Sequence, residues 1–200
     1  MDELKNKFIE GLKQKKPQIL KKDLIADIET PISCLLKLKK NQKYSFLLES
    51  VEGGSLRGRY SILGCDPDII WEVNNNTASI IYNEEDYNYN ISKEPIESLK
   101  NLIEISKFEK GNINIPFPIL VGYLGYPMIK YMEQIELKNK DNINIPDSIL
   151  IRPKIVTVFD NIKDSITVMT VVYPNEKKEI ETLYNKAQGL LEEKVNQLKE

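Results

Sequence analysis

The sequence contains no histidine among its 200 residues. This absence excludes from the chain a Ser-His-Asp triad, a Cys-His pair, a histidine general base and histidine-ligated zinc. Cysteine is scarce too, and Cys34 and Cys65 stand in unrelated contexts without metal-ligand spacing. We expect both to pack as small apolar side chains and to form no disulfide. If the chain belongs to an enzyme that uses a histidine, that histidine lies elsewhere.

The sequence also lacks a strong net charge and a long apolar run. Its formal net charge is −2, and its lysine clusters contain no interleaved aromatic residues, so no nucleic-acid or membrane partner is indicated. The longest apolar run, residues 119–129, is too short to cross a bilayer. Residues 1–16 have no apolar core of a signal peptide. We therefore expect a cytoplasmic protein.

Hydrophobic periodicity predicts a mixture of α-helices and antiparallel strands. Helices are predicted at residues 3–15, 31–38, 92–107 and 176–200. Strands are predicted at residues 19–28, 44–51, 59–64, 68–73, 77–82, 154–159 and 165–173, with a further buried strand running from residue 119 into a short helix. The strands between residues 44 and 82 are joined by short turns, which predicts an antiparallel meander.

Three single positions carry local predictions. Thr30 followed by proline is typical of a helix start. Trp71, the one tryptophan, is predicted to pack in the core. Gly122 and Gly125 interrupt the apolar run after residue 119, where their small size would let another backbone approach closely.

The stretch YSFLLESVEGGSLRGRYSILGCDP, residues 44–67, places a carboxylate and a hydroxyl directly after an apolar run. Three consecutive apolar residues predict a buried strand, and Glu49 would be costly to bury without a partner. One interpretation is an ion pair from Glu49 to Arg57 or Arg59, with Ser50 bonding a backbone group. The other is a site for a small charged ligand at the strand end. The residues alone favour the ion pair.

The glycines of this stretch do not form a phosphate loop. Gly53 and Gly54 are followed by Gly58, but no Lys-Ser or Lys-Thr comes after them. The loop also leads into a strand, whereas a phosphate loop leads into a helix N-terminus. Nucleotide binding is therefore not predicted.

Three motif blocks together resemble the N-terminal region of anthranilate synthase component I, a family of chorismate-utilising enzymes. The blocks are FLLESVEGG with GRYSILGCDP, then PFPILVGYLGYPMIKYMEQ, then IPDSILIRPKIVTVFD, in the order of the family. The Thr30-Pro31 helix start matches as well, so the resemblance covers roughly residues 19–198. A single LLES motif would be too short to be specific, whereas three ordered blocks are specific.

The resemblance implies an α+β fold, with antiparallel β-sheets and outer helices, as the N-terminal part of the two-sheet fold of the family. Residues 1–200 would be the regulatory domain, and the C-terminal chorismate-binding catalytic domain would be absent. The family, a group of lyases, makes anthranilate from chorismate and glutamine-derived ammonia in L-tryptophan biosynthesis. Its implied partner is a glutamine amidotransferase subunit (component II). Mg²⁺ would be bound by the catalytic domain and by no residue of this chain, which we expect to be inactive alone.

The resemblance also assigns a site for L-tryptophan as an allosteric feedback inhibitor. Its residues here are Ser50, with Leu48 and Glu49 beside it, and Arg59, which would orient Glu49 or shape the site. Glu49 would counter the tryptophan ammonium. No catalytic residue and no metal ligand is assigned. The chain alone is expected to bind tryptophan weakly or not at all, and to expose apolar surface around residues 119–128.

Two alternatives stay open. The chain could belong to aminodeoxychorismate synthase component I, the folate-branch relative, although the intact LLES and GRYS motifs favour the tryptophan branch. It could also be a stand-alone, non-catalytic regulatory module that acts in trans on a separate catalytic chain.

Overall fold

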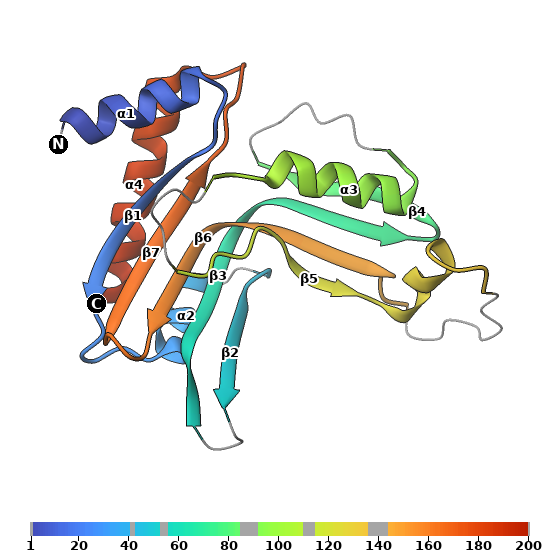
Figure 1. The fold of residues 1–200 in the computed structure, drawn as a ribbon, viewed down its shortest axis with the longest axis horizontal. Helices are drawn as coiled ribbons and strands as arrows, with labels where there is room; N and C mark the ends of the chain where they lie inside the picture. Colours follow the sequence, from blue (N-terminus) through green and yellow to red (C-terminus); the bar gives the residue numbers. More distant parts are fainter. Residues whose placement is uncertain are drawn as a thin grey trace. The chain divides into compact units, whose positions relative to one another are not determined.

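The structure is a computed structural model that describes residues 2–40, 43–52, 56–84, 92–109, 115–135 and 144–199 (Figure 1). The chain divides into two compact units. Unit 1 comprises residues 1–67, 108–118 and 154–200, and unit 2 comprises residues 68–107 and 119–153. The Gly53-Gly54 loop lies outside the described residues.

The described residues form seven strands with antiparallel pairing. They are β1 (Gln18–Ile25), β2 (Phe46–Glu52), β3 (Leu56–Asn74), β4 (Thr77–Asn83), β5 (Val121–Leu124), β6 (Ser148–Asp160) and β7 (Ser165–Val172). The strand order is β1-β7-β6-β3-β2, with β4 paired to β3 and β5 paired to β6. The predicted antiparallel α+β class is confirmed.

Two strands are longer than predicted, and each runs through a proline next to which a predicted strand began. β3 runs through Asp66 and Pro67 without interruption, so separate strands at residues 59–64 and 68–73 were a wrong prediction. β6 likewise begins at Ser148 and runs through Pro153. Proline removes one backbone donor but its φ is compatible with extended backbone. In β3 the irregularity falls on Asp66, which adopts a φ of 50°.

The helices are α1 (Asp2–Lys13), α2 (Pro31–Lys39), α3 (Pro95–Ser106) and α4 (Ile180–Lys199), with a 3₁₀ helix η1 (Tyr126–Tyr131). The predicted start of α2 is confirmed by a complete capping box. The Ser33 N–H donates to the Thr30 hydroxyl oxygen at 3.1 Å, and the Thr30 N–H donates to the Ser33 hydroxyl oxygen at 2.9 Å. Two orphan donors of the first turn are satisfied in this way. None of the helices in the described residues is long and apolar enough to cross a membrane.

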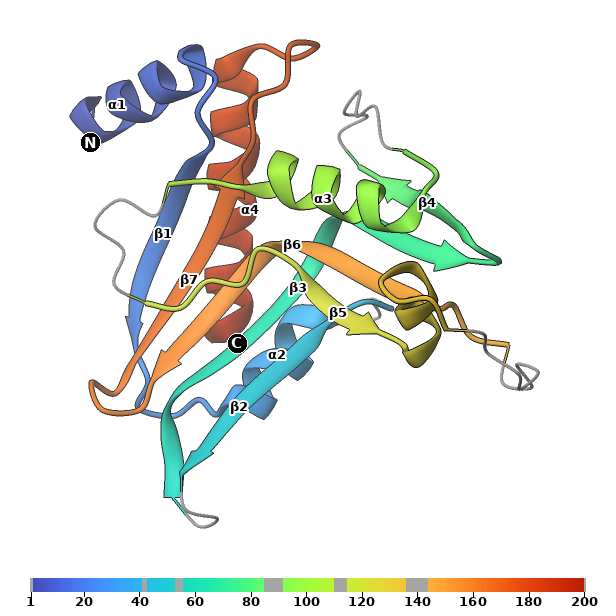
Figure 2. The same cartoon turned by 45° about the vertical axis from the view of Figure 1, so that its right-hand side comes forward.

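The core of unit 1 lies between the sheet and its helices. Figures 1 and 2 both show α4 along one face of β1 and β7. The core of unit 1 includes Leu63, Ile155 and Leu191. Cys34 and Cys65 are fully buried in the same core and form no disulfide with each other, as predicted. Burial raises the pKa of each thiol to about 12, so neither is a reactive nucleophile.

A second cluster of unit 1 joins α1 to α4 and β7. Leu4, Phe8 and Leu12 recur every four residues, which predicts one apolar stripe on α1. Phe8 and Leu12 are buried in this cluster, but Leu4 is 77% exposed. Leu4 lies in the first turns of α1, beyond the part that packs on α4. The apolar stripe is therefore shorter than the sequence periodicity predicts.

The core of unit 2 is built around Trp71, which is fully buried as predicted. Its indole N–H donates to the Ser98 hydroxyl of α3 at 2.8 Å, so the one polar atom of the ring is satisfied. Figure 2 shows α3 beside β4. The spacing of Ile96, Leu99 and Ile103 predicts that these three residues share the buried face of α3. The buried face instead carries Ser98, Leu102 and Ser106, and Ile103 is 40% exposed.

The apolar segment of β5 and η1 behaves as expected at most positions. A Cβ on Gly122 would lie 1.9 Å from the Ile149 carbonyl oxygen, so a side chain here would collide with the paired strand. The expected exposed apolar surface is present in Tyr123, Leu124 and Tyr126, of which Tyr126 is 72% exposed. Met128 is the exception, since it is buried in the core of unit 2.

Candidate functional site

The candidate site lies on the β2–β3 hairpin of unit 1, where the pairing of the two strands is irregular. Glu49 pairs with Ser61, and the next pair joins Val51 to Arg57. Residues 58–60 of β3 therefore lie opposite Ser50 alone. Such an irregularity interrupts the ladder and redirects the local side chains.

The apolar run before Glu49 was predicted to be buried, but the structure leaves it partly exposed. Phe46 and Leu47 are partly buried, Leu48 is 46% exposed, and Glu49 and Ser50 are exposed. The reason is the position of β2, which ends the strand order and pairs only with β3 among the described strands. The cost of burying the Glu49 charge therefore does not arise.

Ser50 bonds a backbone group, as one interpretation of the sequence predicted. Its hydroxyl donates to the Tyr60 carbonyl oxygen at 3.2 Å. Gly58 lies against the same side chain, because a Cβ at residue 58 would be 1.9 Å from the Ser50 Oγ. A glycine at residue 58 is thus what lets the serine fit across the irregular segment.

Arg59 pairs with Asp160 instead of Glu49. Its Nη2 lies 2.9 Å from Oδ2 of Asp160, and its Nε lies 3.3 Å from each carboxylate oxygen. The interpretation in which Arg59 is the ion-pair partner of Glu49 is therefore wrong, whereas the role of Arg59 in shaping the site stays a prediction. β6 lies next to β3, so the aspartate at its end is within reach of the arginine. The alternative partner, Arg57, has a side chain outside the described part of the chain.

The Asp160 carboxylate is almost enclosed, whereas its partner is half-exposed. The exposed fraction is 5% for the Asp160 side chain and 43% for that of Arg59. The hydrogen bond from Arg59 holds the pKa of Asp160 below its usual range, and the N–H groups of Ile162 and Lys163 act in the same direction. The guanidinium also lies 4.8 Å from the Tyr60 ring centroid.

Asn161 is a residue of this site that the sequence did not indicate. Its backbone N–H donates to the Arg59 carbonyl oxygen at 2.8 Å, and its side-chain Nδ2 donates to the Gly58 carbonyl oxygen at 2.8 Å. Residues 160–164 lie between the predicted strands 154–159 and 165–173, a pattern that indicates a hairpin turn and nothing more. No local signal could have revealed the contact, because it joins residues 103 positions apart.

The arrangement offers an acceptor and a hydroxyl to a small polar ligand. Glu49 presents a carboxylate that could receive an ammonium group, Ser50 presents its hydroxyl oxygen, and Leu48 adds apolar surface. Within the described ranges, no group of three or more histidine, cysteine, aspartate or glutamate side chains lies close enough to hold a metal ion.

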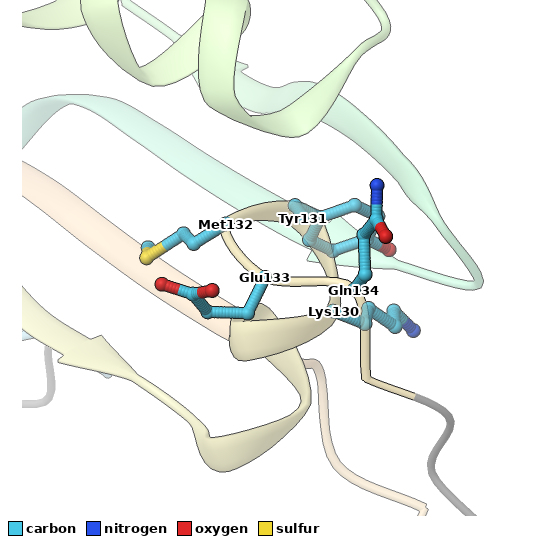
Figure 3. Close-up of a pocket in the computed structure, with 5 residues that line it drawn as sticks. All are labelled: Lys130, Tyr131, Met132, Glu133 and Gln134. Carbon is cyan, nitrogen blue, oxygen red and sulfur yellow. The ribbon is translucent and has the colours of Figure 1, made fainter.

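A shallow hollow of about 510 Å³ lies elsewhere, at the end of η1 in unit 2 (Figure 3). It is lined by Lys130, Tyr131, Met132, Glu133 and Gln134. Figure 3 shows Met132 and Glu133 pointing away from Lys130 and Tyr131. Lys130 bonds Asp147 at 3.4 Å, and the Tyr131 hydroxyl donates to Asn76 Oδ1 at 2.8 Å. Its polar groups therefore do not converge on a ligand, and none of the predicted site residues lines it.

The known proteins that are similar in sequence to this chain share one name. No protein-family model matches the chain. Anthranilate synthase component 1 of Cereibacter sphaeroides is 37% identical over 167 residues, which cover 81% of this chain and 33% of that protein. Its counterparts in Aquifex aeolicus and Pseudomonas putida are 31% and 32% identical, over 89% and 85% of this chain and 36% and 35% of their own lengths.

The chain spans about a third of the length of these relatives. Among solved structures, anthranilate synthase component I from Streptococcus pneumoniae matches 85% of this chain and 36% of its own, at a TM-score of 0.48 and 25% identity. The sequence matches confirm the resemblance that the three ordered motif blocks predicted.

Proposed function

We propose that this chain, an N-terminal region of anthranilate synthase component I, is the regulatory, tryptophan-sensing part of such an enzyme. The complete enzyme would make anthranilate from chorismate in the cytoplasm, with ammonia delivered by a glutamine amidotransferase subunit. Since the chain spans about a third of its relatives, we assign chorismate turnover and Mg²⁺ binding to the remaining part. The 200 residues alone would then form no anthranilate.

One observation carries the proposal: an exposed carboxylate and an exposed hydroxyl follow one another where the β2–β3 pairing is irregular, on a strand at the end of the strand order of the described residues. Glu49 and Ser50 occupy successive positions there, and Leu48 is 46% exposed beside them. A ligand with a cationic end and an apolar body is complementary to these three side chains.

The proposed chemistry follows from these groups. The tryptophan ammonium binds the Glu49 carboxylate through a charge-assisted hydrogen bond. Ser50 already donates its proton to the Tyr60 carbonyl, so its oxygen acts as a further acceptor for the ammonium. Leu48 contacts the indole, and Arg59, directed toward Asp160, shapes the wall of the site from β3.

Inhibition requires that tryptophan bind two states of the enzyme with different affinity. We propose that bound tryptophan favours the state with poor chorismate turnover. The contacts outside this chain that complete the site belong to the remainder of the enzyme, which accounts for the weak tryptophan binding expected of the chain alone.

The test uses the assembled enzyme, by which we mean this chain together with the remaining two thirds of an anthranilate synthase component I, joined or supplied in trans. Ser50→Phe fills the space beside Glu49. We expect it to raise the tryptophan concentration for half-inhibition at least about tenfold. Anthranilate formation without tryptophan should stay within about twofold of the wild type.

Ser79→Phe is the matched control, because Ser79 is an exposed serine on strand β4 of unit 2. It should leave inhibition unchanged. Wild-type inhibition in the Ser50→Phe enzyme would remove Ser50 from the site and overturn the proposal.

A further inference from the structure

We propose that the turn between β6 and β7 is a positioning device for the tryptophan site: Asp160 and Asn161 hold the β3 segment opposite Ser50 in the geometry that inhibition requires. This inference rests on the proposed function and adds to it two residues more than a hundred positions away in the sequence. Neither residue is proposed to touch the ligand. Both act through Gly58, Arg59 and Tyr60.

The first argument concerns the backbone of this segment. Because residues 58–60 lie opposite a single residue of β2, regular ladder bonds to β2 are interrupted there. Backbone carbonyl groups in folded proteins are nevertheless almost always paired with a donor. Asn161 supplies two of them, with its Nδ2 on the Gly58 carbonyl and its backbone N–H on the Arg59 carbonyl, each at 2.8 Å. The third carbonyl, that of Tyr60, accepts from Ser50.

Three successive carbonyls are therefore fixed from two directions. The turn holds the first two, and the proposed site residue Ser50 holds the third. A displacement of the turn is transmitted through one residue of β3 to the Ser50 hydroxyl. Gly58 tightens this coupling, since there is no room for even a Cβ between its backbone and the serine.

The second argument concerns the side chain of Arg59. Asp160 accepts from the guanidinium and also from the N–H groups of Ile162 and Lys163, at 3.1 and 3.3 Å to Oδ1. The enclosed Asp160 carboxylate thus stabilises the β6–β7 turn through the backbone N–H groups of residues 162 and 163, and it also holds the Arg59 guanidinium. Arginine has a long flexible stem, and a fork-shaped partner restricts it to one orientation. Arg59 is then held toward Asp160.

The functional consequence follows from the precision that binding sites need. Ligand-binding groups work only when neighbouring residues hold them to within about 0.5 Å. Ser50 lies on an edge strand, exposed to solvent, and the segment opposite it has lost its regular pairing. Asp160 and Asn161 supply the rigidity that the hairpin itself lacks.

The test compares two substitutions of Asn161 in the assembled enzyme. Asn161→Ala removes the donor to Gly58, and we expect the tryptophan concentration for half-inhibition to rise about three- to tenfold. Asn161→Asp keeps the shape but places an acceptor against the Gly58 carbonyl, so the rise should be larger than for alanine. If Asn161 only filled space, Asn161→Asp should raise the half-inhibition concentration less than Asn161→Ala, because aspartate has nearly the volume of asparagine and alanine is smaller.

Basal anthranilate formation and the KM for chorismate should stay within about twofold of the wild type in both variants. Ile162→Ala is the control within the same turn, since the Ile162 side chain is 71% exposed, and it should leave inhibition unchanged. Asp160→Asn is a second, independent variant, which weakens the hold on Arg59 and should also raise the half-inhibition concentration.

The outcomes separate this inference from the proposed function. If Ser50→Phe abolishes inhibition while the Asn161 and Asp160 variants are inhibited like the wild type, the positioning role is wrong and the proposed site stands. If Ser50→Phe is also inhibited like the wild type, the proposed function fails and the inference with it. A fall in basal turnover and thermal midpoint that parallels the change in inhibition would show a general structural role and overturn the inference.

Discussion

Two arginine–aspartate pairs in this molecule use the same chemistry for different ends. In unit 2, Arg152 and Asp68 form a fork with Nε–Oδ1 at 2.8 Å and Nη2–Oδ2 at 2.7 Å, and the side chains are 1% and 5% exposed. In unit 1, the Asp160 side chain is equally enclosed, but its partner Arg59 is 43% exposed. Exposure of one partner is the main difference.

That difference determines what each pair can do. A buried charge that loses its partner costs several kcal/mol, so Arg152 and Asp68 depend on each other for the stability of unit 2. A half-exposed guanidinium is solvated by water and contributes little to stability. What Arg59 gains from Asp160 is a defined orientation. The buried pair therefore maintains a fold, whereas we propose that the exposed pair arranges a surface beside Ser50.

The largest effect should come from breaking the buried pair. Asp68→Ala leaves the Arg152 charge enclosed and should lower the free energy of unfolding by about 3–5 kcal/mol, measured by urea denaturation. The double variant Asp68→Ala/Arg152→Met removes both charges and should recover much of the loss. A single variant that loses less than about 1 kcal/mol would place this pair in the same class as the exposed one.

A glycine beside the exposed pair should give the next largest effect. Gly58→Ala inserts a methyl group where Ser50 Oγ stands 1.9 Å away, which should cost about 1–3 kcal/mol of unfolding free energy through overpacking. It should also raise the half-inhibition concentration for tryptophan. Gly189→Ala in α4 is the control, since nothing lies within 4 Å of its Cβ. That change should stabilise the chain by about 0.5–1 kcal/mol. Equal effects of the two substitutions would refute the close contact at Gly58.

Replacing the two arginines by glutamine tests the comparison directly. Arg152→Gln should lower the urea midpoint clearly, whereas Arg59→Gln should lower it by a small fraction of that amount because water already solvates the guanidinium. For inhibition by tryptophan we expect the opposite ranking of the two variants. Arg59→Gln should have the larger effect and raise the half-inhibition concentration about threefold or more. Similar urea midpoints for the two variants would contradict the distinction.

The smallest effect concerns pH. The pKa of Asp160 is lowered from its ordinary value of 3.8, chiefly by the hydrogen bond from Arg59. A carboxyl with a lowered folded-state pKa stabilises the fold fully above its unfolded-state value and loses that contribution as pH falls through the folded value. The stability difference between wild type and Asp160→Asn should therefore be constant above about pH 5 and shrink below about pH 4. A difference that persists unchanged at pH 2 would exclude the ionised pair as its source.

Features set by neighbouring residues could be predicted from the sequence. The capping box at Thr30 and the turn at Asn75 and Asn76, which adopt φ values of 49° and 64°, depend on local chemistry. Trp71 could be placed in the core because its size leaves few other options. The family also followed from local motifs in the right order.

Contacts between distant segments could not be predicted. Arg59 meets Asp160 across 101 positions, and Asn161 meets Gly58 across 103. Leu48 is exposed because β2 is an edge strand, and a periodic pattern does not reveal where a strand stands in the sheet order. The Ser50 bond to a backbone carbonyl was predicted as one of two interpretations. The assignment of Leu48, Glu49, Ser50 and Arg59 to tryptophan remains a prediction.

The most direct test of the central claim is a crystal structure of the assembled enzyme grown with L-tryptophan. The proposed site predicts the tryptophan ammonium within hydrogen-bond distance of the Glu49 carboxylate and the Ser50 hydroxyl, with the indole against Leu48. Tryptophan bound at a position that touches none of residues 48–50 would contradict it.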